Sequence, residues 1–230
     1  MLLPPHFPRS APSMFELVTA RPGTIHRILY VALREWSFFG GNYESLAGVV
    51  VRSHDQSESG FFQRVGDYWK KGTGVNHTGK DTDPWSAAFI SYVMLTAGVS
   101  LHDFRRAPSH SRYVHFAIQN RVKNVVGAKF VGRRITEYRP KEGDLICNTR
   151  EASHMTYDKA ITQDGYESHC DIVVFVRPGE IGVVGGNVSG TSKGHRTVGL
   201  RTRRISAGGY LVNRTKDPFF AILENRLPLK

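Results

Sequence analysis

The stretch DTDPWSAAFISYVMLTAG, residues 81–98, places a hydroxyl group at a predicted helix start. Asp83 is the predicted N-cap, Pro84 the first helical residue and Gly98 the stop. Ser86 then occupies the third helical position, where free backbone N–H groups and a partial positive charge favour a developing oxyanion. Ser86 is therefore a candidate nucleophile, although serine is also a common structural residue in a first helical turn.

A serine nucleophile requires a base, because its hydroxyl is far less acidic than a thiol. Of the ten histidines, His169 has the most informative context, since it opens the apolar stretch HCDIVVFV. In a strand Asp171 shares the face of His169, and a hairpin to the next predicted strand brings Asn187 near. Both a carboxylate and an amide can hold an imidazole in one tautomer. The residues alone leave open whether Asp171 or Asn187 orients His169.

These residues need a scaffold, and the sequence predicts helices followed by strands. Helical spacing of apolar residues predicts helices over 25–36, capped by Thr24, and over 58–69 and 109–121. Beyond residue 125, short β-branched segments predict strands, at 128–135, 143–149, 169–176, 181–188, 196–205 and 209–215. RPGE between the third and fourth of these is a hairpin signal. This order is typical of an α+β fold. We divide the chain into a proline-rich arm (1–22) and one domain (23–230).

The charge of the chain predicts an anionic partner. A formal net charge of +11 over 230 residues favours nucleic acid, an anionic lipid surface or a bacterial envelope. No run of about 18 apolar residues is present, so we expect no membrane span. The first residues lack the basic segment of a secretory signal. We therefore expect synthesis in the cytoplasm and, for an envelope target, action in the periplasm or cell wall after lysis or injection.

Cys147 and Cys170 are too few for a disulfide scaffold and are not spaced as a zinc site. Two free buried thiols are favoured over a pair. The sequence also lacks an HExxH motif, and His154 with Asp158 forms only a loose pair. We therefore expect neither a metal nor another cofactor.

Four stretches occur in the order that is typical of one hydrolase family: PWSAAFIS, PKEGDLIC, ESHCDIVV and VGGNVSG. Over about residues 24–215 the chain resembles the papain-like peptidoglycan hydrolases of the NlpC and CHAP type. It is more similar still to an uncharacterised bacterial and phage-associated domain family that has serine in PWSAAFIS. The resemblance implies a papain-like fold, with N-terminal helices packed on a C-terminal antiparallel sheet.

The resemblance also implies roles for single residues. Ser86 takes the place of the cysteine nucleophile, His169 that of the base and Asn187 that of the trailing polar residue. The chain departs from the pattern at Gly185, where many CHAP domains carry a glutamate, and serine replaces the easily ionised cysteine. Asp171 is a candidate to orient the base instead.

Further polar and aromatic residues flank these motifs. We expect Arg150, His110 and Tyr113 at the rim of the cleft as substrate contacts. Trp85 and Tyr68 are candidates to line the groove, and core packing is the alternative for such aromatic residues.

The expected function is hydrolysis of a peptidoglycan amide bond by a Ser–His centre, as an amidase or endopeptidase. The protein would act as a lysis enzyme or an antibacterial effector. One alternative is a non-catalytic module that binds the cell wall or a partner on an inactive hydrolase fold. Another is a nucleic-acid-binding protein, because LRTRRI, GRRI and YWKKG interleave basic and apolar residues. The expected partner is peptidoglycan or another anionic envelope polymer. An immunity or delivery protein is a further candidate, and we expect a monomer.

Overall fold

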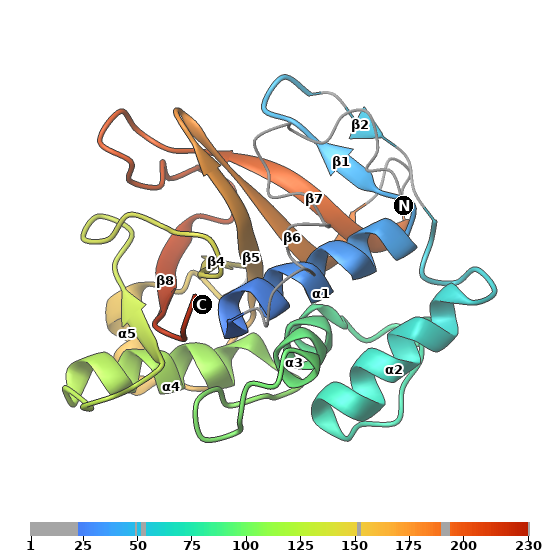
Figure 1. Cartoon of the computed structure of the whole chain (residues 1–230), viewed down its shortest axis with the longest axis horizontal. Helices are drawn as coiled ribbons and strands as arrows, with labels where there is room; N and C mark the ends of the chain where they lie inside the picture. Colours follow the sequence, from blue (N-terminus) through green and yellow to red (C-terminus); the bar gives the residue numbers. More distant parts are fainter. Residues whose placement is uncertain (1–22, 49, 52–53, 151–152, 190–193, 230) are drawn as a thin grey trace.

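The described chain combines helices with one large sheet. The computed structural model describes residues 23–48, 50–51, 54–150, 153–189 and 194–229. The proline-rich arm predicted at 1–22 lies outside these residues. Within them the chain forms five helices and an eight-stranded sheet, so the predicted α+β class is confirmed (Figure 1). No helix in these ranges is both long and apolar enough to cross a bilayer.

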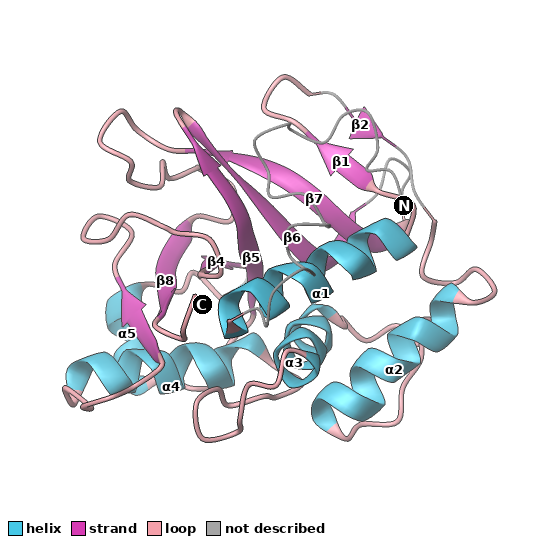
Figure 2. Cartoon of the chain, viewed as in Figure 1, coloured by secondary structure: helices cyan, strands magenta, loops and turns pink. Residues whose placement is uncertain are grey.

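The helices gather on one side of the sheet (Figure 2). They are α1 (Thr24–Phe38), α2 (Phe61–Thr73), α3 (Ser86–Thr96), α4 (His110–Val122) and α5 (Tyr157–Thr162). The first four match the predicted helices, whereas the short α5 was not predicted. Gly23 rather than Thr24 is the N-cap of α1, and Ser109 precedes α4 as predicted.

The strands form a mixed sheet that is antiparallel except for one pair. They are β1 (Asn42–Glu44), β2 (Val50–Val51), β3 (Phe130–Arg133), β4 (Leu145–Thr149), β5 (Ser168–Arg177), β6 (Glu180–Ser189), β7 (Arg196–Arg204) and β8 (Phe219–Asn225). The spatial order is β2-β1-β7-β6-β5-β4-β8-β3, and only β1 and β7 run parallel. The hairpin predicted at RPGE joins β5 to β6.

The strand predicted at 209–215 is wrong. This segment contributes one isolated bridge, between Ile205 and Leu211, and otherwise forms a loop. The side chain of Asn213 accepts hydrogen bonds from the backbone of Arg214 and Phe219, which closes the loop locally. Such side-chain to backbone bonds compete with a strand ladder. The last strand of the sheet is instead β8.

Both faces of the sheet are covered. Between the sheet and the helices lies the main core, which includes Leu29 of α1, Phe89 of α3 and Val184 of β6. On the opposite face Ile146, Val173 and their neighbours form a second apolar cluster, which the loop after β7 covers through Ile205 and Leu211.

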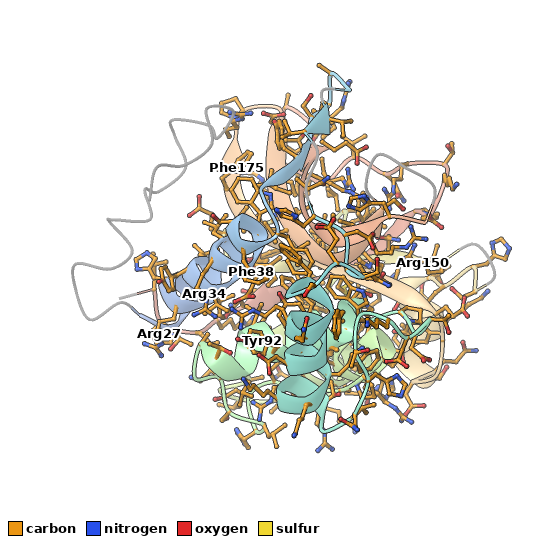
Figure 3. All side chains as sticks on the ribbon, turned by 90° about the vertical axis from the view of Figure 1, so that its right-hand side faces the viewer. Arg27, Arg34, Phe38, Tyr92, Arg150 and Phe175 are labelled. Atoms are coloured by element: carbon orange, nitrogen blue, oxygen red, sulfur yellow. A yellow bond between two sulfur atoms is a disulfide. The ribbon has the colours of Figure 1, made fainter. Side chains whose placement is uncertain are left out.

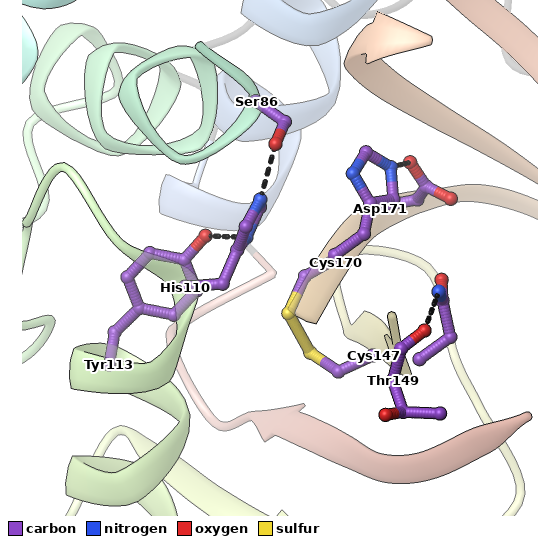
Figure 4. Close-up of a disulfide and its surroundings, with 9 residues drawn as sticks. Ser86, His110, Tyr113, Cys147, Thr149, Cys170 and Asp171 are labelled. Carbon is purple, nitrogen blue, oxygen red and sulfur yellow. Dashed lines mark hydrogen bonds and ion pairs between the residues drawn. A yellow bond between two sulfur atoms is a disulfide. The ribbon is translucent and has the colours of Figure 1, made fainter. Parts of the chain in front are cut away.

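The expectation of two free thiols is wrong, because Cys147 and Cys170 form a disulfide (Figure 4). The two residues are directly opposite on β4 and β5, with their Cα atoms 4.2 Å apart. Opposite positions of an antiparallel pair bring the Cβ atoms within reach of a disulfide. The cysteines are 23 residues apart in sequence. This spacing alone could not predict the register in which the two strands pair.

Candidate functional site

A cavity of about 980 Å³ lies where the first turns of α3 and α4 meet the start of β5 and the end of β6. Its lining includes six of the candidate site residues from the sequence: Ser86, His110, Arg150, His169, Asp171 and Asn187. The fold thus brings residues that are up to about a hundred positions apart into one cavity.

Ser86 is the first residue of α3, so its predicted place at the third helical position is wrong. The N-cap is Trp85 rather than Asp83. Trp85 is fully buried and its indole N–H donates to the side chain of Gln56, which fixes the chain just before the helix. The Asp83 carboxylate lies instead 3.2 Å from Nδ1 of His77. Ser86 still lies in the first turn, whose N–H groups have no acceptor within the helix.

The hydroxyl of Ser86 is hydrogen-bonded to a histidine that the sequence placed only at the rim. Its Oγ lies 2.6 Å from Nε2 of His110, the first residue of α4 (Figure 4). Nδ1 of His110 is in turn hydrogen-bonded to the hydroxyl of Tyr113, one turn along the same helix. His110 is 5% exposed and Tyr113 is fully buried. His110 therefore occupies the position relative to Ser86 that we expected for His169.

Burial keeps the His110 imidazole and the Tyr113 hydroxyl uncharged at neutral pH. It lowers the pKa of His110 well below 6.5, and the nearby His169 and Arg150 lower it further, while Asp171 acts in the opposite direction. Burial likewise raises the pKa of the Tyr113 hydroxyl well above 10. At neutral pH a neutral imidazole can accept the Ser86 proton at Nε2 while its Nδ1–H donates to Tyr113.

His169 belongs to a second pair in the same cavity. Its Nε2 lies 2.7 Å from Oδ1 of Asp171, and the two residues share one face of β5. The rings of His169 and His110 are 5.3 Å apart between centroids. Burial lowers the pKa of His169, and Asp171 opposes this shift. Burial alone would raise the pKa of Asp171, but His169, Arg203 and Arg201 together hold it well below its usual value.

Of the two candidates to orient His169, Asp171 makes the hydrogen bond. Asn187 lines the cavity but lies where the pairing of β6 with β7 is irregular, with a φ of 54°. Gly185 makes room for the aspartate, since a Cβ at this position would lie 1.8 Å from Oδ1 of Asp171. Asp171, on the strand next to Gly185, thus supplies the carboxylate beside His169.

The other predicted contacts divide between the cavity and the core. Arg150, labelled in Figure 3, lines the cavity. Its Nη2 lies 3.4 Å from Nδ1 of His169. Tyr68 and Trp85 are fully buried in the main core, and neither lines the cavity. The expectation that they contact substrate is therefore wrong. The hydroxyl of Tyr68 donates instead to the buried carboxylate of Glu35.

Sequence analysis missed Arg201, Arg203 and Arg214 as residues of this site, although all three line the cavity. A signal for the first two was present, because alternate arginines in LRTRRI share one face of a strand. In the sequence this pattern supports only the alternative of nucleic-acid binding. Over the described ranges no group of three or more His, Cys, Asp or Glu side chains is arranged to hold a metal ion.

Comparison with known proteins identifies one family. Residues 54–225 match a family described as an uncharacterised protein conserved in bacteria, DUF2272. No protein with a curated description and no solved structure matches the chain. The family match covers all the residues that line the cavity, Ser86, His110, His169 and Asp171 among them. The chain belongs to the DUF2272 family of bacterial proteins.

Proposed function

We propose that the protein is a serine-dependent hydrolase of peptidoglycan amide bonds, built on a papain-like fold. The observation that carries the proposal is the 2.6 Å contact between Ser86 Oγ and His110 Nε2 at a helix N-terminus. Nucleophile and base within hydrogen-bond distance, with the base oriented by a third group, are the general signature of covalent catalysis by serine. Tyr113 supplies the third group here.

In the proposed reaction Ser86 Oγ attacks the carbonyl carbon of the amide while its proton passes to Nε2 of His110. Backbone N–H groups in the first turn of α3 stabilise the oxyanion. The imidazolium then returns the proton to the departing amine, and an acyl ester of Ser86 remains. During this step the Nδ1–H of His110 donates to the Tyr113 oxygen and holds the ring in place.

His169 and Asp171 serve the second half of this reaction. With its Nε2–H donated to Asp171, His169 presents an unprotonated Nδ1 beside Arg150. In our proposal this nitrogen takes a proton from the water that attacks the acyl ester. The bond between the acyl carbon and Ser86 Oγ then breaks, the carboxylic acid product leaves, and the proton returns to Ser86 Oγ. Asp171 stabilises the imidazolium that forms, as a buried carboxylate does for a catalytic histidine.

Three observations support a cell-wall substrate. The chain belongs to a bacterial family and carries a net charge of +11, which attracts it to an anionic polymer. The disulfide between Cys147 and Cys170 is suited to an oxidising compartment such as the periplasm. The order of nucleophile on a helix and histidine on a following strand is that of the NlpC and CHAP hydrolases, which the chain resembles. Action as a lysis enzyme or an injected effector is part of this proposal.

A second candidate function is binding of the cell wall without cleavage. The observation that favours it is the environment of His110, whose Nδ1 partner is a neutral phenol rather than a carboxylate. Its lowered pKa makes it a weaker base than an unperturbed histidine. In this reading the cavity binds peptidoglycan and Ser86 is a polar contact.

The deciding experiment is release of soluble muropeptides from purified sacculi. We expect release by the natural protein and none by Ser86→Ala. His102→Gln is a matched control, since the side chain of His102 is 96% exposed and does not line the cavity. Binding in a pelleting assay by all variants, with release by none, would support the binding module instead. Unchanged release by Ser86→Ala would refute the proposed nucleophile.

A further inference from the structure

Arginines from three separate segments line the cavity beside the proposed catalytic groups. Arg150 follows β4, Arg203 lies on β7 and Arg214 lies in the loop before β8. Over the described ranges no side-chain carboxylate lies within ion-pairing distance of these three. Arg201, by contrast, pairs with Glu44 at 3.1 Å. The three arginines thus make no close ion pair in the described chain, although Asp171 interacts with Arg203 and Arg214 at longer range.

Arg203 has a buried hydrogen-bond donor without an acceptor. Its Nη1 donates to the backbone oxygen of Thr202 at 3.0 Å, but its Nε is buried and has no partner. A buried donor without an acceptor is destabilising. Because Arg203 also lines the cavity, an anion bound there would be attracted to its guanidinium. Burial lowers the pKa of Arg203 only to about 10, so that it remains a cation at neutral pH.

The other two arginines are held in place before any ligand binds. Nε of Arg214 donates to the backbone oxygen of Asp217 at 2.9 Å, and its guanidinium lies 4.6 Å from the centre of the Phe219 ring. Arg150 lies 3.4 Å from His169. An anion bound here would therefore lie next to the site of the proposed reaction.

The charges of the cavity favour a single carboxylate over a polyanion. Four acidic residues also line it: Asp83, Glu167, Asp171 and Asp217. They would repel the successive phosphates of a nucleic acid, whereas a peptide with both amino and carboxyl groups suits a wall of mixed charge. Guanidinium groups bind carboxylates through two parallel hydrogen bonds.

We infer that Arg150, Arg203 and Arg214 form a subsite for a carboxylate next to the scissile amide of a peptide substrate. The choice of a peptide rests on the proposed function. The preferred substrate would then be a stem peptide with a free carboxyl group near the bond that is cut, and the amidated form of the same peptide would bind weakly.

Calorimetry on the full chain carrying Ser86→Ala tests this subsite without turnover. The probes are a disaccharide-tetrapeptide muropeptide with free carboxyl groups and the same compound with these groups converted to primary amides. We expect the free form to bind about tenfold or more tightly, as charge-assisted hydrogen bonds require. Adding Arg150→Gln, Arg203→Gln or Arg214→Gln should remove this difference. Arg204→Gln is the matched control, because Arg204 is exposed on the same strand and does not line the cavity.

Each outcome bears on the inference. Equal or undetectable binding of the two probes would overturn it, as would an equal loss in the Arg204→Gln control. A 20-nucleotide single strand could instead bind more tightly than the muropeptide and lose binding in the same variants. That result would show that the three arginines bind nucleic acid rather than a carboxylate. Should Arg203→Gln fail to fold, Arg150→Gln and Arg214→Gln decide the matter. Selective binding without muropeptide release by the natural protein would keep the subsite and refute the proposed function.

Discussion

Replacing His110 with glutamine separates the two histidines as candidates for the base that acts on Ser86. Glutamine keeps a polar side chain of similar length but cannot take up a proton at neutral pH. Loss of a general base lowers kcat/KM by about 10²- to 10⁴-fold. At about 1.4 kcal/mol for each factor of ten, this corresponds to roughly 3–5 kcal/mol of transition-state stabilisation. We expect a loss in this range for His110→Gln, because Nε2 of His110 lies 2.6 Å from the nucleophile.

The assay is the initial rate of muropeptide release as a function of pH. Affinity for the substrate is measured separately, as the binding of sacculi by the Ser86→Ala protein. The base must be neutral to act, and the pKa of His110 is lowered well below 6.5. The rate should therefore stay level as the pH falls from 7 to 6.5 and decline only at lower pH. His110→Gln should lose this acidic limb together with the rate.

His169→Gln gives the contrasting result. If His169 acts on the attacking water, this variant should still acylate Ser86 and show a burst of one amine product for each enzyme molecule, followed by slow turnover. Activity of His110→Gln within about threefold of the natural protein, with complete loss and no burst in His169→Gln, would refute our assignment. His169 would then be the base that acts on Ser86, as the sequence predicts.

Three further predictions follow from the same contacts. Tyr113→Phe leaves the buried Nδ1–H of His110 without an acceptor, which costs about 1–3 kcal/mol, so kcat/KM should fall by about tenfold or more without loss of sacculus binding. Cys147→Ser with Cys170→Ser removes a loop constraint of about 3 kcal/mol and should lower the Tm by roughly 6–12 °C in calorimetry; an unchanged Tm would contradict a disulfide in the folded protein. Gly185→Ala places a Cβ 1.8 Å from Oδ1 of Asp171 and should destabilise the fold by about 1–3 kcal/mol, whereas Gly165→Ala, which has open space around its Cβ, should not change the denaturation midpoint.

Local patterns predicted most of the scaffold because the forces that form it are local. Pro84 and the stop at Gly98 indicated α3, and periodic apolar residues indicated α1. Residues with β-branched side chains between turn signals indicated β5 and β6. The errors fall where a tertiary contact overrides the local preference. Asp83 is a good N-cap by residue type, but the buried indole of Trp85 fixes the chain so that the helix begins at Ser86.

The partner of Ser86 could not be predicted in this way. His110 is 24 residues away and opens a different helix, and no periodicity relates the first turns of two helices to each other. The apolar stretch after His169 correctly predicted a strand there. The order of residues along the chain, however, carries no information about which imidazole faces the Ser86 hydroxyl. Only the packing of α3 and α4 on the sheet determines that.

The carboxylate beside His169 could likewise not be located from residue order alone. The resemblance to CHAP domains predicts a glutamate at position 185, and the chain has a glycine there. Judged by that resemblance, the proposed site would lack a carboxylate. In the sheet, the missing side chain at Gly185 creates the space that Asp171 of the adjacent strand fills, 2.7 Å from His169. The carboxylate beside His169 therefore comes from the adjacent strand and needs a glycine at 185. Gly185 and Asp171 should consequently be treated as one unit in any mutational test of this site.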